Sequence, residues 1–394
     1  MPLTSSSVVG VLGAGAMGAG IAQVAAAAGH TVVLADAHQP ALQRALDGFA
    51  KEMARDVEKG RRTQAEANAL VARISLADAG AGMQPFANCE LVIEAIVEDL
   101  AVKRAVFAAL ESAVAPTAVL ATNTSSLSIS AIAAACTRPD RILGVHFFNP
   151  APRMPLVEII AGVATDATVV TNARALVDAW GKTTVLATDT PGFIVNRVAR
   201  PFYGEALRIA EEGIADPATI DWAMRELGKF RMGPFELMDF IGHDINYTVT
   251  KSVWEAMYFD ERFKPSLLQK RLLDAGRLGR KSGRGFYEYA DGAPKPSPSE
   301  DPKLGGEILN RIVVMLINEA ADAVHLGVAT AAEIDLAMTK GVNYPRGLLA
   351  WANDIGPAEV LARMDALHLE YRESRYRASP LLRWLVREGR TFGV

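Results

Sequence analysis

The chain has 394 residues, of which 50% are hydrophobic and 22% are charged, so its composition is that of folded domains and excludes a wholly disordered chain. Its 41 basic side chains are outnumbered by 45 acidic ones, which leaves no basic excess for binding nucleic acid. The only two cysteines, Cys89 and Cys136, are far apart in sequence, which excludes a disulfide framework and a thiolate metal site.

Targeting segments are also missing from the sequence pattern. No apolar run has the length of a membrane span, and the first residues lack the basic and apolar regions of a secretory signal. We therefore expect a soluble, cytoplasmic protein that binds no metal, no membrane and no nucleic acid.

Short β-rich runs alternate with helical patterns through the first half of the chain, as a parallel sheet requires. These runs are residues 8–12, 31–35, 91–96, 118–121, 142–148 and 157–160. Because the runs are apolar throughout, we expect helices to cover both faces of the sheet.

A glycine-rich turn, GAGAMG at residues 13–18, follows the first run directly and opens an alanine-rich helix. Gly13 permits a tight turn, Gly15 lets the backbone approach a pyrophosphate, and Gly18 allows close packing of helix on strand. The amino end of the helix offers N–H groups and a positive dipole to phosphates. Together with Met17, these residues predict a dinucleotide site; the alternative is a glycine turn that binds nothing.

Asp36 ends the second strand and strengthens the prediction of a dinucleotide site. A carboxylate at this place accepts hydrogen bonds from the ribose hydroxyls of the adenosine and repels a 2′-phosphate. No arginine follows within the next three residues, so the sequence favours NAD over NADP. A solvated acid at the end of a strand is the alternative.

The segment between Asp36 and Leu91 carries a helical insertion. Apolar residues recur at helical spacing from residue 42 to residue 57, and Gly60 ends this helix. Thr63 and Glu66 then have the spacing of a capping box, which begins a second helix. We expect two antiparallel helices that project from the sheet.

From Pro191 onward helical patterns replace the strands, and a proline-rich stretch at residues 291–303 reads as a linker. The segments on its two sides, 194–242 and 308–356, repeat one another without a gap, which indicates a duplicated domain. Identical pairs include Asn196 and Asn310, Arg197 and Arg311, Glu205 and Glu319, Gly213 and Gly327, Asp221 and Asp335, and Gly242 and Gly356.

The predicted fold class is an α/β Rossmann-type doubly wound sheet with a helical-hairpin insertion, followed by two all-α C-terminal domains related by duplication. The predicted boundaries are 1–189 for the nucleotide-binding domain, 190–290 for the first helical domain, 291–303 for the linker and 304–394 for the second helical domain.

Among the six histidines, only His146 lies in a β-rich run, where two phenylalanines follow it. A buried core histidine is the simpler interpretation from composition alone. Glu158 lies in the next apolar run and is a possible partner for the ring.

Several motifs in chain order resemble the NAD-dependent L-3-hydroxyacyl-CoA dehydrogenases. The resemblance covers about residues 8–290, and the repeated tail is similar to members with two C-terminal helical units. The motifs are the glycine turn, EAIVE at 94–98, NTSSL at 123–127, HFFNP at 146–150, PGFIVNR at 191–197 and GRKSGRGFY at 279–287.

This resemblance implies that Ser125, His146, Glu158 and Asn196 form the catalytic set. A histidine, with an ordinary pKa of ~6.5, suits a base that removes the C3 hydroxyl proton and returns it in the reverse direction. Glu158 would hold the imidazole in its working tautomer. Ser125 and Asn196 would give neutral hydrogen bonds to the substrate oxygens and the nicotinamide.

The resemblance further places certain residues around the cofactor and suggests one contact with CoA. For Glu98 and Lys103 the alternative is a solvated helical pair. For Lys281 it is a basic surface turn, and for Asn149 it is a residue that only shapes the turn before Pro150. The cofactor residues are Glu98, Lys103, Ser125, Asn149 and Lys281. Glu52 stands where the family often has a serine that contacts CoA, so Lys59 is the one match for a CoA contact, with a solvated charged face as its alternative.

The predicted activity is the NAD-dependent interconversion of (S)-3-hydroxyacyl-CoA and 3-ketoacyl-CoA. A short acyl chain is expected, such as 3-hydroxybutyryl or 3-hydroxyadipyl, in fatty acid or aromatic acid degradation. A dehydrogenase of a free hydroxy acid of the gulonate type and a non-catalytic, crystallin-like NADH-binding protein are the alternatives. Because single-unit relatives dimerise through their helical domains, we expect a monomer with an internal pseudo-dimer, or a homodimer.

Overall fold

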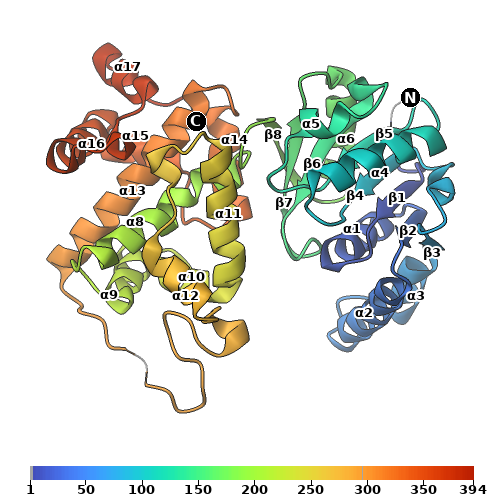
Figure 1. The fold of residues 1–394 in the computed structure, drawn as a ribbon, viewed down its shortest axis with the longest axis horizontal. Coiled ribbons are helices and arrows are strands. Elements are labelled where there is room, and N and C mark those ends of the chain that lie inside the picture. The colour runs from blue at the N-terminus through green and yellow to red at the C-terminus, as the bar shows by residue number, and fades with distance from the viewer. Residues whose placement is uncertain (1–2, 295) are drawn as a thin grey trace. The chain divides into compact units, whose positions relative to one another are not determined.

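The structure is a computed structural model that describes residues 3–294 and 296–394 (Figure 1). Its contacts divide the chain into two compact units, Met1–Thr190 and Pro191–Val394. The first unit contains the sheet, and the described part of the second is helical apart from isolated β-bridges near residues 279–288.

Eight strands form one sheet in the order β3-β2-β1-β4-β5-β6-β7-β8. Neighbouring strands are parallel except β6 and β7, which are antiparallel. The strands are β1 (Val9–Leu12), β2 (Val32–Asp36), β3 (Ile74–Asp78), β4 (Leu91–Glu94), β5 (Val119–Thr122), β6 (Ile142–Phe147), β7 (Leu156–Ala161) and β8 (Thr183–Thr188). The first six follow the Rossmann order, so the predicted fold class is confirmed for this unit.

Two strands of the sheet were not predicted from the sequence. β3 lies within the segment interpreted as a helical insertion. Its sequence, ISLAD, mixes polar and apolar residues, none of which is buried, so it gives little apolar signal. β8 is framed by threonines and follows α6 closely, so no apolar run marks it. Both strands lie at the edges of the sheet, where side chains are less buried.

Helices pack on both faces of the sheet, as the apolar strands predicted. Leu91 and Ile93 of β4 join a core cluster with α1, α2, α3 and α6, whereas Val92 joins a second cluster with α4 and α5. Successive side chains of a strand point to opposite faces, which explains this alternation. The helices are α1 (Ala16–Ala27), α2 (Gln39–Glu58), α3 (Gln64–Ala72), α4 (Leu100–Ala113), α5 (Ile129–Ala133) and α6 (Ala167–Ala179).

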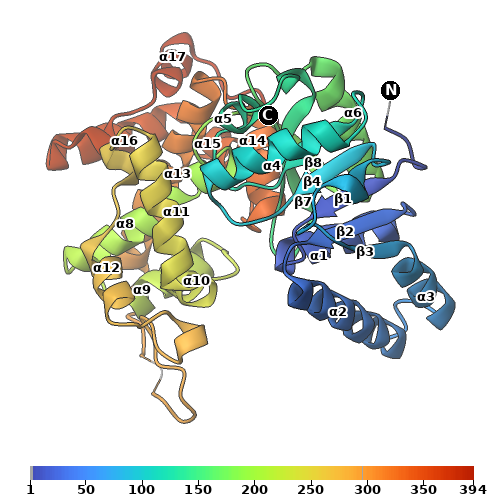
Figure 2. The same cartoon turned by 45° about the vertical axis from the view of Figure 1, so that its right-hand side comes forward.

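The helical insertion consists of α2 and α3, which pack on one another and extend away from the sheet (Figure 2). Thr63 accepts a hydrogen bond from the backbone N–H of Glu66, and the Glu66 side chain accepts one from the backbone N–H of Thr63. The predicted capping box is therefore confirmed, and Gly60, with φ of 65°, lies in the turn between the two helices.

The second unit is built from helices. Among all the helices described in the chain, none has the length and apolar character needed to cross a membrane. Its α-helices are α7 (Val195–Val198), α8 (Arg200–Glu211), α9 (Pro217–Trp222), α10 (Pro234–Ile241), α11 (His243–Ala256), α12 (Leu267–Asp274), α13 (Pro302–His325), α14 (Ala331–Gly341), α15 (Leu348–Ile355), α16 (Pro357–Tyr371) and α17 (Pro380–Glu388). α13 begins inside the stretch predicted as linker, because the Asp301 side chain caps it.

The repeat seen in the sequence is also visible in the local structure. The Asp221 carboxylate accepts hydrogen bonds from the backbone N–H groups of Phe235 and Glu236, and so holds the start of α10. Asp335 makes the same pair of bonds 114 residues later, to Leu349 and Ala350 at the start of α15.

Candidate active site

The glycine turn lies between β1 and α1. Gly13 has φ of 103°, and a side-chain carbon built on it would lie 2.6 Å from the Ala95 carbonyl oxygen. A side-chain carbon on Gly18 would lie 1.8 Å from the carbonyl oxygen of Gly13, so this glycine is required by packing. A side-chain carbon on Gly15 would meet no protein atom within 4 Å. The space over Gly15 is therefore open to a ligand.

The amino end of α1 suits a pyrophosphate. Gly15 is its N-cap residue, and among the described residues no side chain caps the helix. The first N–H groups of α1, with the positive end of the helix dipole, thus remain for an anion. Met17 is in the first turn of this helix. The residues at this turn fit a dinucleotide.

Asp36, the last residue of β2, lies beside the turn. One carboxylate oxygen accepts a hydrogen bond from the backbone N–H of Ala14 at 2.6 Å, and the other accepts one from the backbone N–H of His38 at 2.8 Å. The carboxylate is thereby held next to the turn, where the sequence prediction requires it for the ribose.

A cavity of about 530 Å³ adjoins the glycine turn. Its lining comes from the turn, from α1 and α2, and from the segment that follows β6, including Asn149. Arg44, Glu52 and Arg153 give it charged walls, whereas Lys59, at the far end of α2, is exposed and does not line it.

A buried ion pair lies at the carboxyl end of β4, whose last residue is Glu94. The Glu94 side chain is fully buried and accepts hydrogen bonds from Lys103 Nζ at 2.5 Å, Thr122 Oγ1 at 2.7 Å and the backbone N–H of Ile96. Lys103 Nζ, on α4, also lies 3.3 Å from Glu98. Lys103 is 1% exposed, so its ammonium orders the two glutamates and does not itself face solvent.

Glu98 in turn holds the loop that carries Ser125. Its Oε1 accepts hydrogen bonds from Thr124 Oγ1 at 2.5 Å, from the backbone N–H of Ser125 at 2.9 Å and from Ser126 Oγ at 3.1 Å. Burial raises the pKa of Glu98, but these hydrogen bonds and Lys103 outweigh it, so the pKa lies below its ordinary value. Glu98 is an anion at neutral pH.

His146 and Glu158 are direct neighbours on β6 and β7. His146 Nδ1 lies 2.6 Å from Glu158 Oε2, and both side chains are buried. The antiparallel register puts the two residues opposite one another, on the same face of the sheet. The possible pairing inferred from the sequence is thus present. The phenylalanine ring of Phe148 lies 4.6 Å from the imidazole, centre to centre.

The structure brings most of the predicted residues of the first unit into three groups: the turn with Asp36, the Glu98 group with Lys103 and Ser125, and the His146–Glu158 pair. Asn196 and Lys281 belong to the second unit, Asn196 in α7 and Lys281 in an exposed turn where it pairs with Asp244 at 2.5 Å.

Three polar residues that organise these groups were not predicted. Glu94 and Thr124 form the hydrogen bonds described above, and the side chain of Asn123 accepts one from the backbone N–H of Phe147 at 2.8 Å. Asn123 therefore ties the Ser125 loop to the strand of His146. Their position in the sequence could have indicated a role, because Glu94 ends β4, and Asn123 and Thr124 directly follow β5. Ligands of such sheets bind at the carboxyl ends of the strands.

Family models match almost the whole chain. The model for the NAD binding domain of 3-hydroxyacyl-CoA dehydrogenase matches residues 8–190, and the model for its C-terminal domain matches residues 192–289 and 306–392. The chain belongs to the 3-hydroxyacyl-CoA dehydrogenase family. It is an NAD-dependent dehydrogenase, and the cofactor and reaction class predicted from the sequence are confirmed.

Named members of the family are similar over most or nearly all of this chain. The chain is 39% identical to a 3-hydroxyadipyl-CoA dehydrogenase of Escherichia coli, over 95% of this chain and 96% of that protein. It is 42% identical to a probable 3-hydroxybutyryl-CoA dehydrogenase of Bacillus subtilis, over 71% of this chain and 96% of that one. The crystal structure of a 3-hydroxybutyryl-CoA dehydrogenase from Escherichia coli superposes with a TM-score of 0.93 at 37% identity, covering 98% of this chain and all of that one.

Two glycines of the turn give this dehydrogenase a matched test of NAD binding. We expect Gly15→Ala to weaken NADH binding by at least about 10-fold, because the added methyl group fills the space over the turn, without loss of thermal stability. Gly18→Ala is expected to lower the melting temperature, because its methyl group meets backbone. NADH titration and thermal unfolding of both variants check this; unchanged NADH affinity in Gly15→Ala contradicts the placement of the pyrophosphate.

Proposed function

We propose that the chain interconverts short-chain (S)-3-hydroxyacyl-CoA and 3-ketoacyl-CoA with His146 as the acid–base group. The contact of 2.6 Å between His146 Nδ1 and Glu158 carries this proposal. A buried carboxylate on one ring nitrogen fixes the tautomer and orientation of the imidazole and stabilises its protonated form. In this proposal the other ring nitrogen exchanges a proton with the substrate.

The glycine turn and Asp36 would hold NAD, which would supply the hydride acceptor or donor for C3 of the substrate. His146 removes the proton of the C3 hydroxyl in the oxidation and delivers it to the ketone oxygen in the reduction. Glu158 positions the imidazole throughout and stabilises its positive charge. Proton transfer by a positioned histidine accounts for a rate factor of about 10²–10⁴.

Ser125 and Asn196 complete the proposed catalytic set as hydrogen-bond donors to substrate oxygens and to the nicotinamide. Glu98, held by Lys103 and by the hydroxyls of the loop, fixes Ser125 for this task. Asn149 lines the cavity beside the turn, which supports its contact with the cofactor. Lys281, at the nicotinamide cofactor, and Lys59, at CoA, stay as proposals from the family resemblance.

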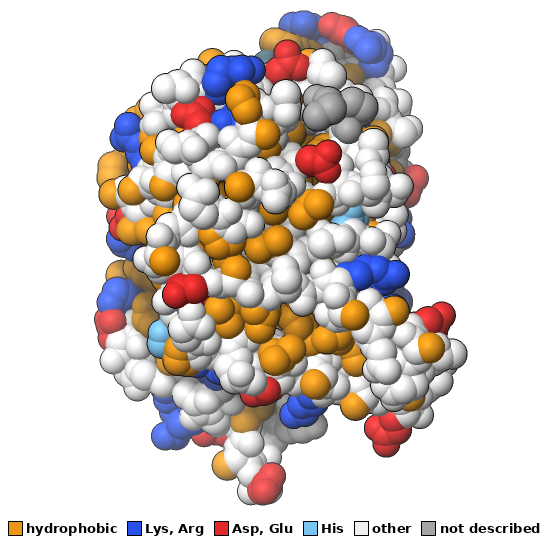
Figure 3. Space-filling model, turned by 90° about the vertical axis from the view of Figure 1, so that its right-hand side faces the viewer, with side chains coloured by type: hydrophobic (Ala, Val, Ile, Leu, Met, Phe, Trp, Pro, Cys, Tyr) orange, Lys and Arg blue, Asp and Glu red, His pale blue; other side chains and the backbone are white. Residues whose placement is uncertain are grey.

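The acyl group is proposed to be 3-hydroxybutyryl or 3-hydroxyadipyl, following the names of the relatives. Degradation of fatty acids or aromatic acids in the cytoplasm is the matching role. On the face shown in Figure 3, basic side chains are scattered among acidic and uncharged ones, and the described residues drawn there form no continuous basic patch. A small-molecule substrate, with no nucleic acid as a partner, is proposed from the net acidic charge of the sequence.

Turnover of a defined substrate panel tests the proposal. The purified chain is expected to oxidise NADH with acetoacetyl-CoA and to leave free 3-keto acids unreacted. Turnover of the free acid in preference to the CoA ester would assign the chain to the gulonate type instead. NADH binding with no turnover of either compound would support a non-catalytic, crystallin-like protein.

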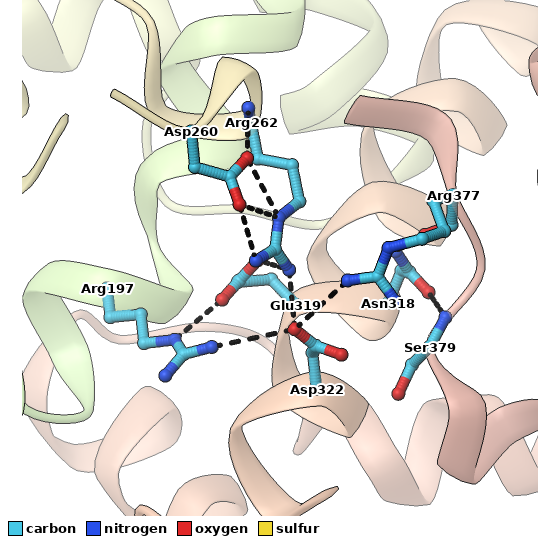
Figure 4. Close-up of polar contacts among 8 residues, drawn as sticks. All are labelled: Arg197, Asp260, Arg262, Asn318, Glu319, Asp322, Arg377 and Ser379. Atoms are coloured by element: carbon cyan, nitrogen blue, oxygen red, sulfur yellow. Dashed lines mark hydrogen bonds and ion pairs between the residues drawn. The ribbon is translucent and has the colours of Figure 1, made fainter. Parts of the chain in front are cut away.

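We further propose that the two helical repeats pack on one another as two subunits do in a dimer, which makes one chain a pseudo-dimer. Reciprocal ion pairs support this packing: one joins α7 to α13, and its counterpart joins α13 to α8. Arg197 Nε donates to Glu319 at 2.7 Å, and its counterpart Arg311 Nε donates to Glu205, the counterpart of Glu319, at 3.1 Å. Figure 4 shows the first pair, with Arg262 and Asp322 beside it.

If the second repeat occupies the dimer surface of the first, the full chain is expected to remain a monomer. Light scattering of the full-length enzyme at assay concentration should give a mass near 42.1 kDa. A mass of twice this value would contradict the pseudo-dimer as the final assembly and establish the homodimer.

A further inference from the structure

A buried arginine without a carboxylate partner lies in the second unit. Arg200 is the first residue of α8 and is 7% exposed. Its Nη1 donates to Thr250 Oγ1 at 3.0 Å, and its guanidinium carbon lies 5.0 Å above the centre of the Tyr203 ring. Among the described residues, Nε has no hydrogen-bond partner and no acid lies within ion-pair distance of the guanidinium.

Neighbouring arginines of the same helical core are paired. Arg197 contacts Glu319, Arg208 contacts Glu205, and Arg311 contacts Glu205 and Glu212. A buried charge is tolerated when it is paired, and an unpaired one is costly. Burial accordingly lowers the pKa of Arg200 below that of an ordinary arginine. Arg200 therefore differs from these three arginines in having no carboxylate partner among the described residues.

The duplicated domain shows that the fold does not need a charge at this place. The position that corresponds to Arg200 in the second repeat is Val314, a buried residue of α13. An aliphatic side chain thus fills the equivalent place in the second repeat. Asn310 and Arg311 repeat Asn196 and Arg197, so the charge at position 200 distinguishes two otherwise similar segments.

The surroundings of Arg200 provide hydroxyl groups for an anion. Tyr203 and Tyr344 are buried, and both interact electrostatically with Arg200. The Tyr344 hydroxyl has no hydrogen-bond partner among the described residues. A guanidinium flanked by hydroxyls matches the geometry of a carboxylate, whose oxygens accept several hydrogen bonds.

Arg200 also lies within reach of the proposed reacting end of the substrate. It follows Asn196 by four residues, and the intervening backbone is helical apart from one turn residue, Ala199. Residues four apart lie on the same face of a helix, about 6 Å apart along its axis. In an acyl chain, the distance from C3 to a terminal carboxylate a few bonds farther on is comparable to this separation.

We propose that Arg200 binds the carboxylate at the far end of the acyl chain, so that the preferred substrates are 3-hydroxydicarboxylyl-CoA esters. This inference rests on the proposed function, which places Asn196 at the reacting end. An uncharged acyl chain leaves the buried guanidinium unpaired, so such substrates should react with a lower kcat/KM than the dicarboxylyl esters.

Two substrates of equal chain length test the inference. 3-Ketoadipyl-CoA and 3-ketohexanoyl-CoA differ in the carboxylate that replaces the terminal methyl group. The wild-type enzyme is expected to have a kcat/KM at least about 10-fold higher for the adipyl ester, and Arg200→Met should lower this ratio by about 10- to 100-fold. Arg225→Met, which removes an exposed arginine of the same unit, should leave the ratio as it is.

The possible outcomes distinguish failure of the role proposed for Arg200 from failure of the proposed dehydrogenase activity. A wild-type preference for the hexanoyl ester, or an unchanged ratio in Arg200→Met, overturns the role of Arg200 while the dehydrogenase assignment stands. Failure of the wild-type enzyme to reduce either ester refutes the proposed function itself. If Arg200→Met does not fold, the wild-type ratio and that of Arg200→Lys, which keeps the charge but loses the planar fork, still decide the matter.

Discussion

Replacing His146 by glutamine is expected to lower kcat for acetoacetyl-CoA reduction by about 10³-fold, within the range for loss of a positioned acid–base group. Glutamine retains hydrogen-bonding capacity and comparable bulk, but it cannot take up and release a proton. Because the pair with Glu158 lies on β6 and β7, away from the glycine turn on β1, the affinity for NADH should stay within about twofold. Steady-state kinetics and an NADH titration measure the two effects.

His368→Gln provides the matched control, because this histidine lies on α16 in the second unit and contacts a backbone carbonyl. Its kinetics should equal those of the wild type. Wild-type turnover in His146→Gln would remove this residue from the chemistry. Equal losses of NADH affinity and of kcat would instead show that His146 supports the structure of the site.

Replacing Lys103 by methionine is expected to lower the free energy of unfolding by about 3–5 kcal/mol, the usual cost of leaving one member of a buried ion pair unpaired. Glu94 is fully buried and would keep only its hydrogen bonds to Thr122 and Ile96. Glu98 would lose its nearest cation, so the Ser125 loop should also become less ordered. Denaturant unfolding of the wild type and the variant measures the loss.

Lys251→Met is the control for removing a lysine, since Lys251 forms an exposed helical pair with Glu255 and should cost no more than about 0.5 kcal/mol. A cycle with Glu94→Gln and the double variant isolates the coupling between Glu94 and Lys103. A loss for Lys103→Met no larger than that for Lys251→Met would contradict the buried pair.

The parts of the fold that the sequence predicted are those with strong local signals. The glycine turn after a short apolar strand, the Thr63–Glu66 capping box and the duplicated segments around Asp221 and Asp335 each depend on residues near one another in sequence. Their local hydrogen bonds and turns determine the structure without knowledge of distant contacts. The predicted fold class depended also on the alternation of apolar runs with helical patterns and on the family resemblance.

What the sequence could not predict depends on pairing across the sheet or across the helical core. The register that puts Glu158 opposite His146 is set by strand pairing, and the contact of Lys103 with Glu94 by packing of α4 on the sheet. From the sequence, Glu98 and Lys103 equally fit a solvated pair; in the structure the ammonium is buried. That Arg200 has no carboxylate partner among the described residues can be seen only in the folded structure, where its neighbours are known.

A crystal structure of the enzyme with NAD⁺ and acetoacetyl-CoA tests the central claim most directly, namely that the imidazole of His146 handles the proton of the C3 oxygen. The expected result is a distance of about 2.6–3.2 Å between His146 Nε2 and that oxygen, with Glu158 still on Nδ1 and the reactive carbon of the nicotinamide facing C3. A complex in which the C3 oxygen contacts another acid–base side chain, with the imidazole turned away from the ester, would contradict the claim.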